Sequence, residues 1–143
     1  MSWHILVVNS NAERRVSDAL IDKGLIVYYP KLKYPVIHRH TVEVRERAAF
    51  SRYIFLSLPC VIVKLRNTPG LQYVMKNSEG EYSIVDDEIV HEIQDREKHG
   101  FFNEGSICAI HDLHARVLDV AKRGKVKVSI FMFGVERVAE MSV

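Results

Sequence analysis

The sequence is poor in cysteine, in proline and in long apolar runs, and each shortage excludes a class of protein. Its 143 residues include two cysteines and four prolines. Cys60 and Cys108 lie far apart in apolar runs, which is typical of buried free thiols in a reducing compartment rather than of a disulfide framework. No secretory segment is present and no apolar run is long enough to cross a bilayer. We therefore expect a cytoplasmic protein with no membrane partner.

The signatures of common enzyme classes are also missing. The sequence has no Gly-rich phosphate loop, no Cys-x-x-Cys, no His-Glu-x-x-His and no nucleophile elbow. His38 with His40, and His111 with His114, each offer two imidazoles but no third ligand close in the sequence, so we expect no metal site. The acidic run at 86–88 is better explained as the start of a helix than as catalytic carboxylates. We predict a protein that is not an enzyme and that uses no cofactor.

What the chain does contain is a core-forming share of apolar residues and an uneven charge. Hydrophobic residues make up 48% of the chain, which is enough for a packed core. The net charge of +2 conceals a basic segment at 1–78, with 12 Lys and Arg against 5 Asp and Glu, and an acidic segment at 79–97. The basic segment is compatible with a polyanionic partner such as nucleic acid, or with an ordinary solvated surface.

Residues 1–98 are predicted to form one α+β domain. Apolar runs rich in β-formers predict strands at 3–8, 25–29, 50–58 and 71–75. Ser10 and Glu13 have capping-box spacing, which predicts that a helix starts there, and a second helix is expected at 86–99. The polar segment 38–47 is typical of a hairpin tip or a mobile loop, and 61–65 is either a strand or a helical turn.

Beyond Gly105 the pattern becomes one of short apolar runs separated by turns. Strands are predicted at 107–110, 115–120, 125–133 and 135–141. The third run alternates apolar and polar residues with a period of two, which is typical of a half-buried strand. We predict that residues 103–143 form a small antiparallel barrel, with the domain boundary near 98–103.

In order along the chain, these segments resemble the NusG family of transcription elongation factors. The resemblance is carried by Trp3-His-Ile-Leu-Val-Val before a helix, by Phe50-Ser-Arg-Tyr-Ile-Phe-Leu, by Asn67-Thr-Pro-Gly-Leu-Gln-Tyr-Val before an acidic helix, and by Lys125-Val-Lys-Val-Ser-Ile-Phe-Met-Phe-Gly. It implies a NusG N-terminal-type antiparallel sheet flanked by helices, followed by an SH3-like (KOW) β-barrel.

The resemblance also implies a function. Such N-terminal domains bind the clamp helices of the largest RNA polymerase subunit through an apolar concavity on the sheet, bridge the nucleic-acid cleft, and suppress pausing or termination. The matching positions are Val7, Phe50, Tyr53 and Phe55. Aromatic anchors suit an interface hot spot, and the alternative is that all four are core residues. We expect Phe50 and Tyr53 to be the main contacts.

A second implied contact is with DNA. In RfaH-like members the start of the first helix touches the non-template strand, and the matching positions here are Ser10, Asn11, Arg14 and Arg15. Arg52 stands where the family has Gly or Asn, and it can reach solvent, an acidic polymerase surface or a phosphate. For the two helix arginines the alternative is a solvated face.

Departures from the family pattern affect the C-terminal part. The stretch His111-Asp-Leu-His-Ala lacks the glycines of the KOW turn, and Val135 replaces an arginine. A divergent, specialised paralogue with a degenerate KOW domain is implied, with ribosomal protein S10, Rho or RNA as the open choices for the barrel's partner. One alternative is an RNA- or ribosome-binding KOW-type module that acts without polymerase. Another is a helical tail that hides the polymerase site; the period-two pattern predicts a β resting state instead.

Overall fold

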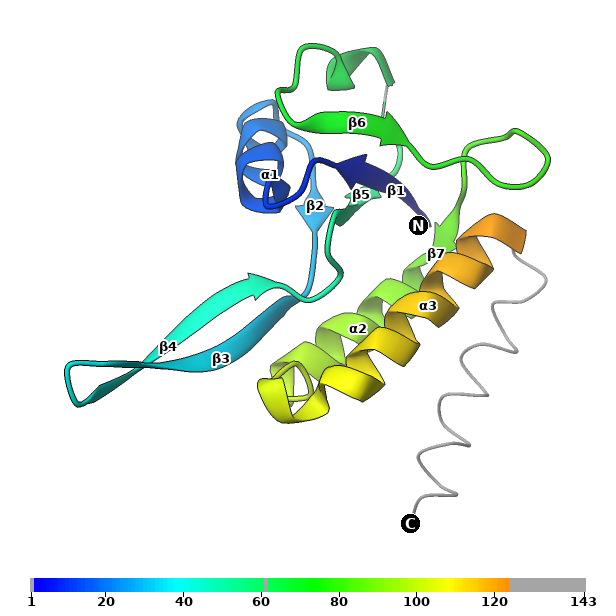
Figure 1. Cartoon of the computed structure of the whole chain (residues 1–143). Coiled ribbons are helices and arrows are strands. Elements are labelled where there is room, and N and C mark those ends of the chain that lie inside the picture. The colour runs from blue at the N-terminus through cyan, green and yellow to red at the C-terminus, as the bar shows by residue number, and fades with distance from the viewer. Residues whose placement is uncertain (1, 61, 124–143) are drawn as a thin grey trace, which may run out of the picture.

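The computed structural model describes residues 2–60 and 62–123, and its centre is an antiparallel sheet of five strands (Figure 1). The strands lie in the order β2 (Val27–Tyr28), β5 (Tyr53–Ser57), β1 (Ser2–Val8) and β6 (Leu71–Val74), and β7 (Val85–Asp86) pairs with the first residues of β1. Six of the seven residues of β1 are buried. A continuous apolar run suits this central place, because both faces of the strand are covered.

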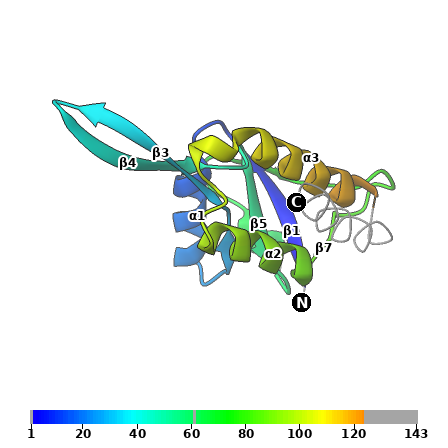
Figure 2. The ribbon, with the colours of Figure 1, turned by 90° about the horizontal axis from the view of Figure 1, so that it is seen from below.

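Helices cover the two faces of the sheet. The first helix, α1 (Glu13–Asp22), packs on one face, while α2 (Asp87–Lys98) and α3 (Ile107–Arg123) lie on the other (Figures 1 and 2). Two short 3-10 helices, η1 (Ile62–Leu65) and η2 (Glu104–Ser106), lie in the connections. The result is a mixed helix and sheet fold, which confirms the α+β class predicted for the N-terminal part.

Strand alternation divides the core into two clusters. Ile5 and Val7 of β1 contribute to the cluster shared with α2 and α3, whereas Leu6 and Val8 contribute to the cluster shared with α1. The pairing of β1 with β5 places Ile5 opposite Phe55, so both strands send alternate side chains to the same two layers.

A two-stranded hairpin projects from this core (Figures 1 and 2). It consists of β3 (Lys31–His38) and β4 (Thr41–Ala48), paired along their whole length. The prediction of a hairpin tip or mobile loop at 38–47 is therefore wrong for most of that segment. The turn itself is Arg39-His40, and both residues have positive φ, 48° and 69°. Two-residue turns with this conformation usually contain Asn-Gly. Because this chain has Arg-His there, the sequence pattern did not predict the turn.

Several predictions for the first domain are confirmed, with local corrections. The expected strands and both helices are present, and segment 61–65 contains the 3-10 helix η1. The predicted capping box at the first helix is wrong. The N-cap is Ala12, no side chain caps it, and Glu13 is already the first helical residue. Asn11, with φ of 61°, turns the chain into the helix instead.

The largest correction concerns the segment after Gly105. Strands were expected at 107–110 and 115–120, but residues 107–123 form the single helix α3. Ile110, Leu113, Val117 and Val120 are buried at spacings of three and four residues, which is a helical period that the short-run interpretation missed. No barrel is present in the part of the chain described, and the strands predicted at 125–133 and 135–141 lie outside it.

Candidate functional site

Three of the four residues expected to bind polymerase share one face of the sheet. Val7 on β1 lies directly opposite Tyr53 on β5, and Phe55 follows two residues further along β5. Phe50 lies just before β5 and packs in the same cluster. Val7, Phe50 and Phe55 are buried, while Tyr53 is half-buried. The structure therefore brings the four residues together, and it places three of them in the core of the described chain.

Phe50 is the centre of an aromatic cluster on this face. Its ring lies 6.4 Å from that of Phe55 and 6.0 Å from that of Phe102, both edge-on, and 4.6 Å from the imidazole of His114, which is stacked parallel to it. His114 also meets the ring of Tyr53 at 4.9 Å, edge-on. Such contacts bury a large apolar area and fix the ring orientations.

Helix α3 covers this face together with α2. Its apolar stripe, which is described above, belongs to the same cluster as Val7 and Phe50. The last turn of α3 is held by the backbone N–H of Ser78, which donates to the carbonyl of Lys122 at 3.1 Å. The predicted docking face is thus an internal helix–sheet contact in this structure.

One polar atom in that contact has no partner. The Nε2 atom of His114 is sealed from solvent and forms no hydrogen bond with the described residues. Burial, together with the neighbouring His111, lowers the pKa of His114 to about 4. The imidazole is therefore neutral at pH 7, and its unsatisfied nitrogen opposes the packing of α3.

The residues expected to contact DNA are exposed at the start of α1. Ser10, Asn11, Arg14 and Arg15 lie on consecutive or neighbouring positions there, and all four are exposed. Arg14 forms only a loose pair with Asp18, at 4.0 Å between Nε and Oδ2, with both side chains largely in solvent. Pairs of this kind contribute little to stability, so Arg14 is free to meet a ligand.

The turn that follows η1 is tied to the end of α1. The Nζ atom of Lys23 donates to the carbonyls of Lys64 and Arg66, at 3.1 and 3.0 Å, and to Oγ1 of Thr68 at 3.0 Å. Gly70 then passes so close to α1 that a Cβ atom there would lie 3.1 Å from Cβ of Ala12. These contacts hold the turn against α1, near the predicted DNA-contact positions.

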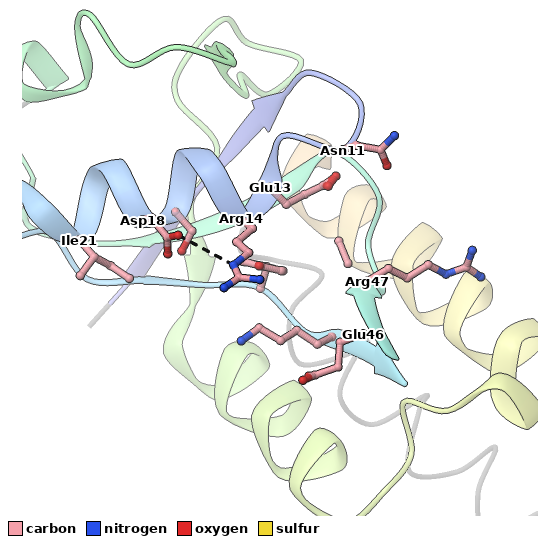
Figure 3. A pocket seen from close by; sticks show the side chains of 11 residues that line it. Asn11, Glu13, Arg14, Asp18, Ile21, Glu46 and Arg47 are labelled. Atoms are coloured by element: carbon pink, nitrogen blue, oxygen red, sulfur yellow. Dashed lines mark ion pairs between the residues drawn. The ribbon is translucent and has the colours of Figure 1, made fainter. Parts of the chain in front are cut away.

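A pocket that sequence reasoning missed lies between α1 and the base of the hairpin (Figure 3). It measures about 550 Å³ and is lined from α1 by Glu13, Arg14 and Ser17 and from the hairpin side by Tyr29 and Arg47, among others. The sequence pattern predicts Glu13 as half of a capping box. Only the tertiary structure shows that its side chain lines a cavity, because β3 and β4 are distant in sequence.

In the part of the chain that the structure describes, no three His, Cys, Asp or Glu residues are grouped to hold a metal ion. Among the described helices, none combines the length and the apolar character that a membrane span requires.

The comparison with known families decides the identity of the N-terminal part. A family model described as "Transcription termination factor nusG" matches residues 1–94. The chain belongs to the NusG family. No curated protein matches the chain. The NusG family comprises transcription elongation and termination factors that are not enzymes and that generally bind RNA polymerase.

The NusG match ends inside α2, and α3, which covers the predicted docking face at Phe50 and Tyr53, lies beyond it. The matched part contains the whole sheet, α1 and the four predicted polymerase contacts. Helix α3 and the connection before it follow the matched residues.

The backbone conformation at position 52 suits the Gly or Asn that the family resemblance implies there. Arg52 has a φ of 73°, the left-handed conformation that glycine and asparagine adopt most readily. Its guanidinium donates to the carbonyl of Val8 at 3.1 Å and to Oε1 of Gln72 at 2.9 Å, and Gln72 donates to Oδ1 of Asn9 at 2.7 Å. These bonds offset the backbone strain and link the ends of β1, β5 and β6.

Proposed function

We propose that this NusG-family chain binds the clamp helices of the largest RNA polymerase subunit through the face formed by Val7, Phe50, Tyr53 and Phe55. From there it bridges the nucleic-acid cleft and suppresses pausing or termination. A protein that spans the cleft favours the closed state of the clamp, so it shifts a population and performs no chemistry.

One observation carries the proposal. The family-matched part presents an apolar sheet face that α2 covers in part, and α3, which lies outside the matched part, covers it at Phe50 and Tyr53. An apolar face of this kind needs a partner, and α3 is the partner in the described state. The same face is where the family resemblance places the polymerase contacts, so one surface serves two occupants in turn.

Docking on polymerase therefore requires α3 to leave the sheet. Tyr53 and Phe50 cannot contact both His114 and a clamp helix, because the stacking and edge contacts at 4.6 and 4.9 Å leave no room between the rings. The unsatisfied Nε2 of His114 weakens the closed state and makes release easier. For residues 107–123, α3 favours the helical tail that hides the polymerase site over a β resting state.

The exposed start of α1 is proposed to contact the non-template DNA strand. Arg14 and Arg15 supply positive charge for phosphates, and Ser10 and Asn11 supply polar side chains. Arg52 supports this surface from within, since its guanidinium holds Gln72, which in turn donates to the side chain of Asn9.

The test is retention of RNA polymerase by variants of the full chain. Leu113 is buried between α3 and the sheet, so Leu113→Glu places a charge in that contact and should release α3. We expect Leu113→Glu to retain more polymerase than the wild type, and Leu113→Glu/Tyr53→Ala to lose that gain. Phe50 is 1% exposed and its replacement would damage the core, so Tyr53 is the better probe.

Tyr34→Ala in the Leu113→Glu background is the matched control, because Tyr34 is also half-buried but lies on the hairpin. Equal retention by Leu113→Glu with and without Tyr53→Ala would refute the proposed face. Absence of retention by every variant would refute polymerase docking altogether.

A further inference from the structure

The base of the hairpin is bonded to the end of α2 and to the connection between α2 and α3. The backbone N–H of Lys31 donates to Oε2 of Glu97 at 2.6 Å, and the backbone N–H of Lys33 donates to the carbonyl of Phe102 at 3.2 Å. A parallel bridge between Lys33 and Asn103 extends the second contact. These contacts form the hairpin anchor, and they place the connection beside the first residues of β3 (Figures 1 and 2).

Beyond the anchor, the outer edge of β3 has no comparable support. Backbone groups alternate between the two edges of a strand, so the nitrogens of Pro35 and Ile37 share the outer edge with those of Lys31 and Lys33. Pro35 has no N–H to donate, which is usual for proline in an edge strand. The N–H of Ile37 meets no acceptor outside the hairpin in the described chain. Of the four positions, only the first two bond the outer edge of β3 to the rest of the described protein.

Phe102 links the hairpin anchor to the docking face. Its carbonyl belongs to the anchor, while its side chain is buried, with 3% exposed. The ring of Phe102 lies edge-on to that of Phe50, with 6.0 Å between the centroids, and Phe50 is stacked on His114 of α3. One residue therefore contacts the hairpin through its backbone and, through its side chain, the ring on which α3 is seated.

Only the short helix η2 separates the hairpin anchor from α3. The turn before it is closed by hydrogen bonds: the N–H of Ser106 donates to the carbonyl of Asn103 at 3.0 Å, and Nδ2 of Asn103 donates to the carbonyl of Gly100 at 2.6 Å. The four steps from Asn103 to Ile107 span at most about 14 Å, even in a fully extended chain. A large displacement of α3 therefore either opens the anchor or bends the chain within η2.

We propose that the hairpin anchor couples the position of the hairpin to the seating of α3. When α3 leaves the docking face, the anchor opens and the hairpin is released from α2. By reciprocity, any contact that holds the hairpin away from the anchor favours the open docking face, because both events bias the same two-state element. This inference rests on the release of α3 in the proposed function, and it makes the hairpin a second place from which that release is controlled.

The first experiment compares amide hydrogen exchange, measured by mass spectrometry, in the full-length wild type and in Leu113→Glu, the variant designed to release α3. We expect peptides that cover residues 31–33 to exchange at least about fivefold faster in the variant, together with the peptides of α3, because amide protection reports local opening. Continued protection of β1 and β5 shows that the sheet remains folded. Faster exchange of α3 with an unchanged rate at residues 31–33 would mean that the chain bends within η2, and it would overturn the proposal.

The second experiment opens the anchor from the hairpin side. Lys33→Pro removes the N–H that donates to Phe102, and it leaves the pairing with β4 intact because that N–H faces away from β4. We expect the peptides of α3 to exchange at least about threefold faster than in the wild type. Ile37→Pro is the matched control, since its N–H lies on the same outer edge without an acceptor outside the hairpin. Equal exchange of α3 in the two proline variants would overturn the proposal.

Glu97→Gln weakens the other half of the anchor without changing β3, and it decides the question if the proline in Lys33→Pro also removes protection from the sheet. The Glu97 carboxylate accepts from the hydroxyl of Tyr28 at 2.9 Å and from the N–H of Lys31, so faster exchange of α3 is expected here as well. Glu88→Gln, at an exposed acid in the first turn of α2, is the control, and equal exchange of α3 in the two glutamine variants would contradict the coupling. None of these measurements contains polymerase. If Lys33→Pro opens α3 but retains no more polymerase than the wild type, the docking proposal fails and the coupling stands.

Discussion

The imidazole of His114 is stacked on the ring of Phe50, with 4.6 Å between the ring centroids and 4° between the planes. This contact joins α3, outside the NusG match, to the face that the family resemblance assigns to polymerase. The stacking buries apolar ring surface, but it also buries Nε2 of His114, which has no hydrogen-bond partner in the described chain. Two predictions follow from the opposing effects of stacking and burial at this one residue.

Replacing His114 with Phe should stabilise the closed state. A phenyl ring can keep the stacking on Phe50 and the edge contact with Tyr53, and it removes the unsatisfied nitrogen, so we expect the free energy of unfolding to rise by about 1 kcal/mol. Urea denaturation measures the change. His111→Phe is the control, because His111 is exposed and its replacement should have little effect. A less stable His114→Phe protein would show that the imidazole has an essential partner.

The stability of the protein should fall as the pH is lowered through the titration range of His114. The pKa of this residue is about 4 in the folded protein against an ordinary 6.5, so the unfolded chain binds the proton more readily. The contribution is fully present above about pH 6.5 and is lost progressively as the pH falls towards about 4. The difference in unfolding free energy between His114→Phe and the wild type should be constant above about pH 6.5 and should widen in favour of the variant as the pH falls towards about 4. Parallel curves would contradict the lowered pKa.

Gly70 should not tolerate a side chain. Its φ is +93°, and a Cβ atom would lie 2.9 Å from Nη2 of Arg15 and 3.1 Å from Cγ2 of Val16. We expect Gly70→Ala to cost at least about 2 kcal/mol, from backbone strain and crowding together. Gly80→Ala separates the two causes, because Gly80 has a similar φ of +82° with open space around it and should cost only about 1 kcal/mol. Equal losses in thermal denaturation would mean that the approach to α1 is not tight.

At Arg52, hydrogen bonds of the side chain stabilise the fold while the positive φ destabilises it, and two substitutions should separate these effects. Arg52→Ala keeps the positive φ and loses the bonds to Val8 and Gln72, so we expect a loss of about 1–2 kcal/mol. Arg52→Gly loses the same bonds but removes the strain, and it should be about 1 kcal/mol more stable than Arg52→Ala. Chemical denaturation of both variants measures the difference. A glycine variant no better than the alanine variant would show that the backbone there is unstrained.

Local sequence patterns predicted most of the N-terminal part. The apolar run at 3–8 is long enough to be covered on both faces, and it forms the centre of the sheet. The helices at 13–22 and 87–98 follow from apolar periodicity and from an acidic first turn. The resemblance predicted that Val7, Tyr53 and Phe55 belong to one surface. The pairing register of β1 and β5 places them on one face.

The hairpin and the segment after Gly105 were misjudged for physical reasons. Arg39-His40 adopts a turn that local propensity does not favour, because the strands on either side impose it. In residues 107–123 the apolar positions are compatible with short strands as well as with a helical stripe, and burial against the sheet selects the helix.

By itself, then, the sequence determined the alternating core of the first domain, the basic character of residues 1–78 and the membership of the chain in the NusG family. The tertiary structure decided what covers the predicted docking face and which pocket Glu13 lines. Both depend on contacts between segments far apart in the chain: His114 with Phe50 and Tyr53, and α1 with the base of the hairpin. Residue types and spacings predict which side chains seek burial or a partner, but only the packed chain determines which partner each one meets.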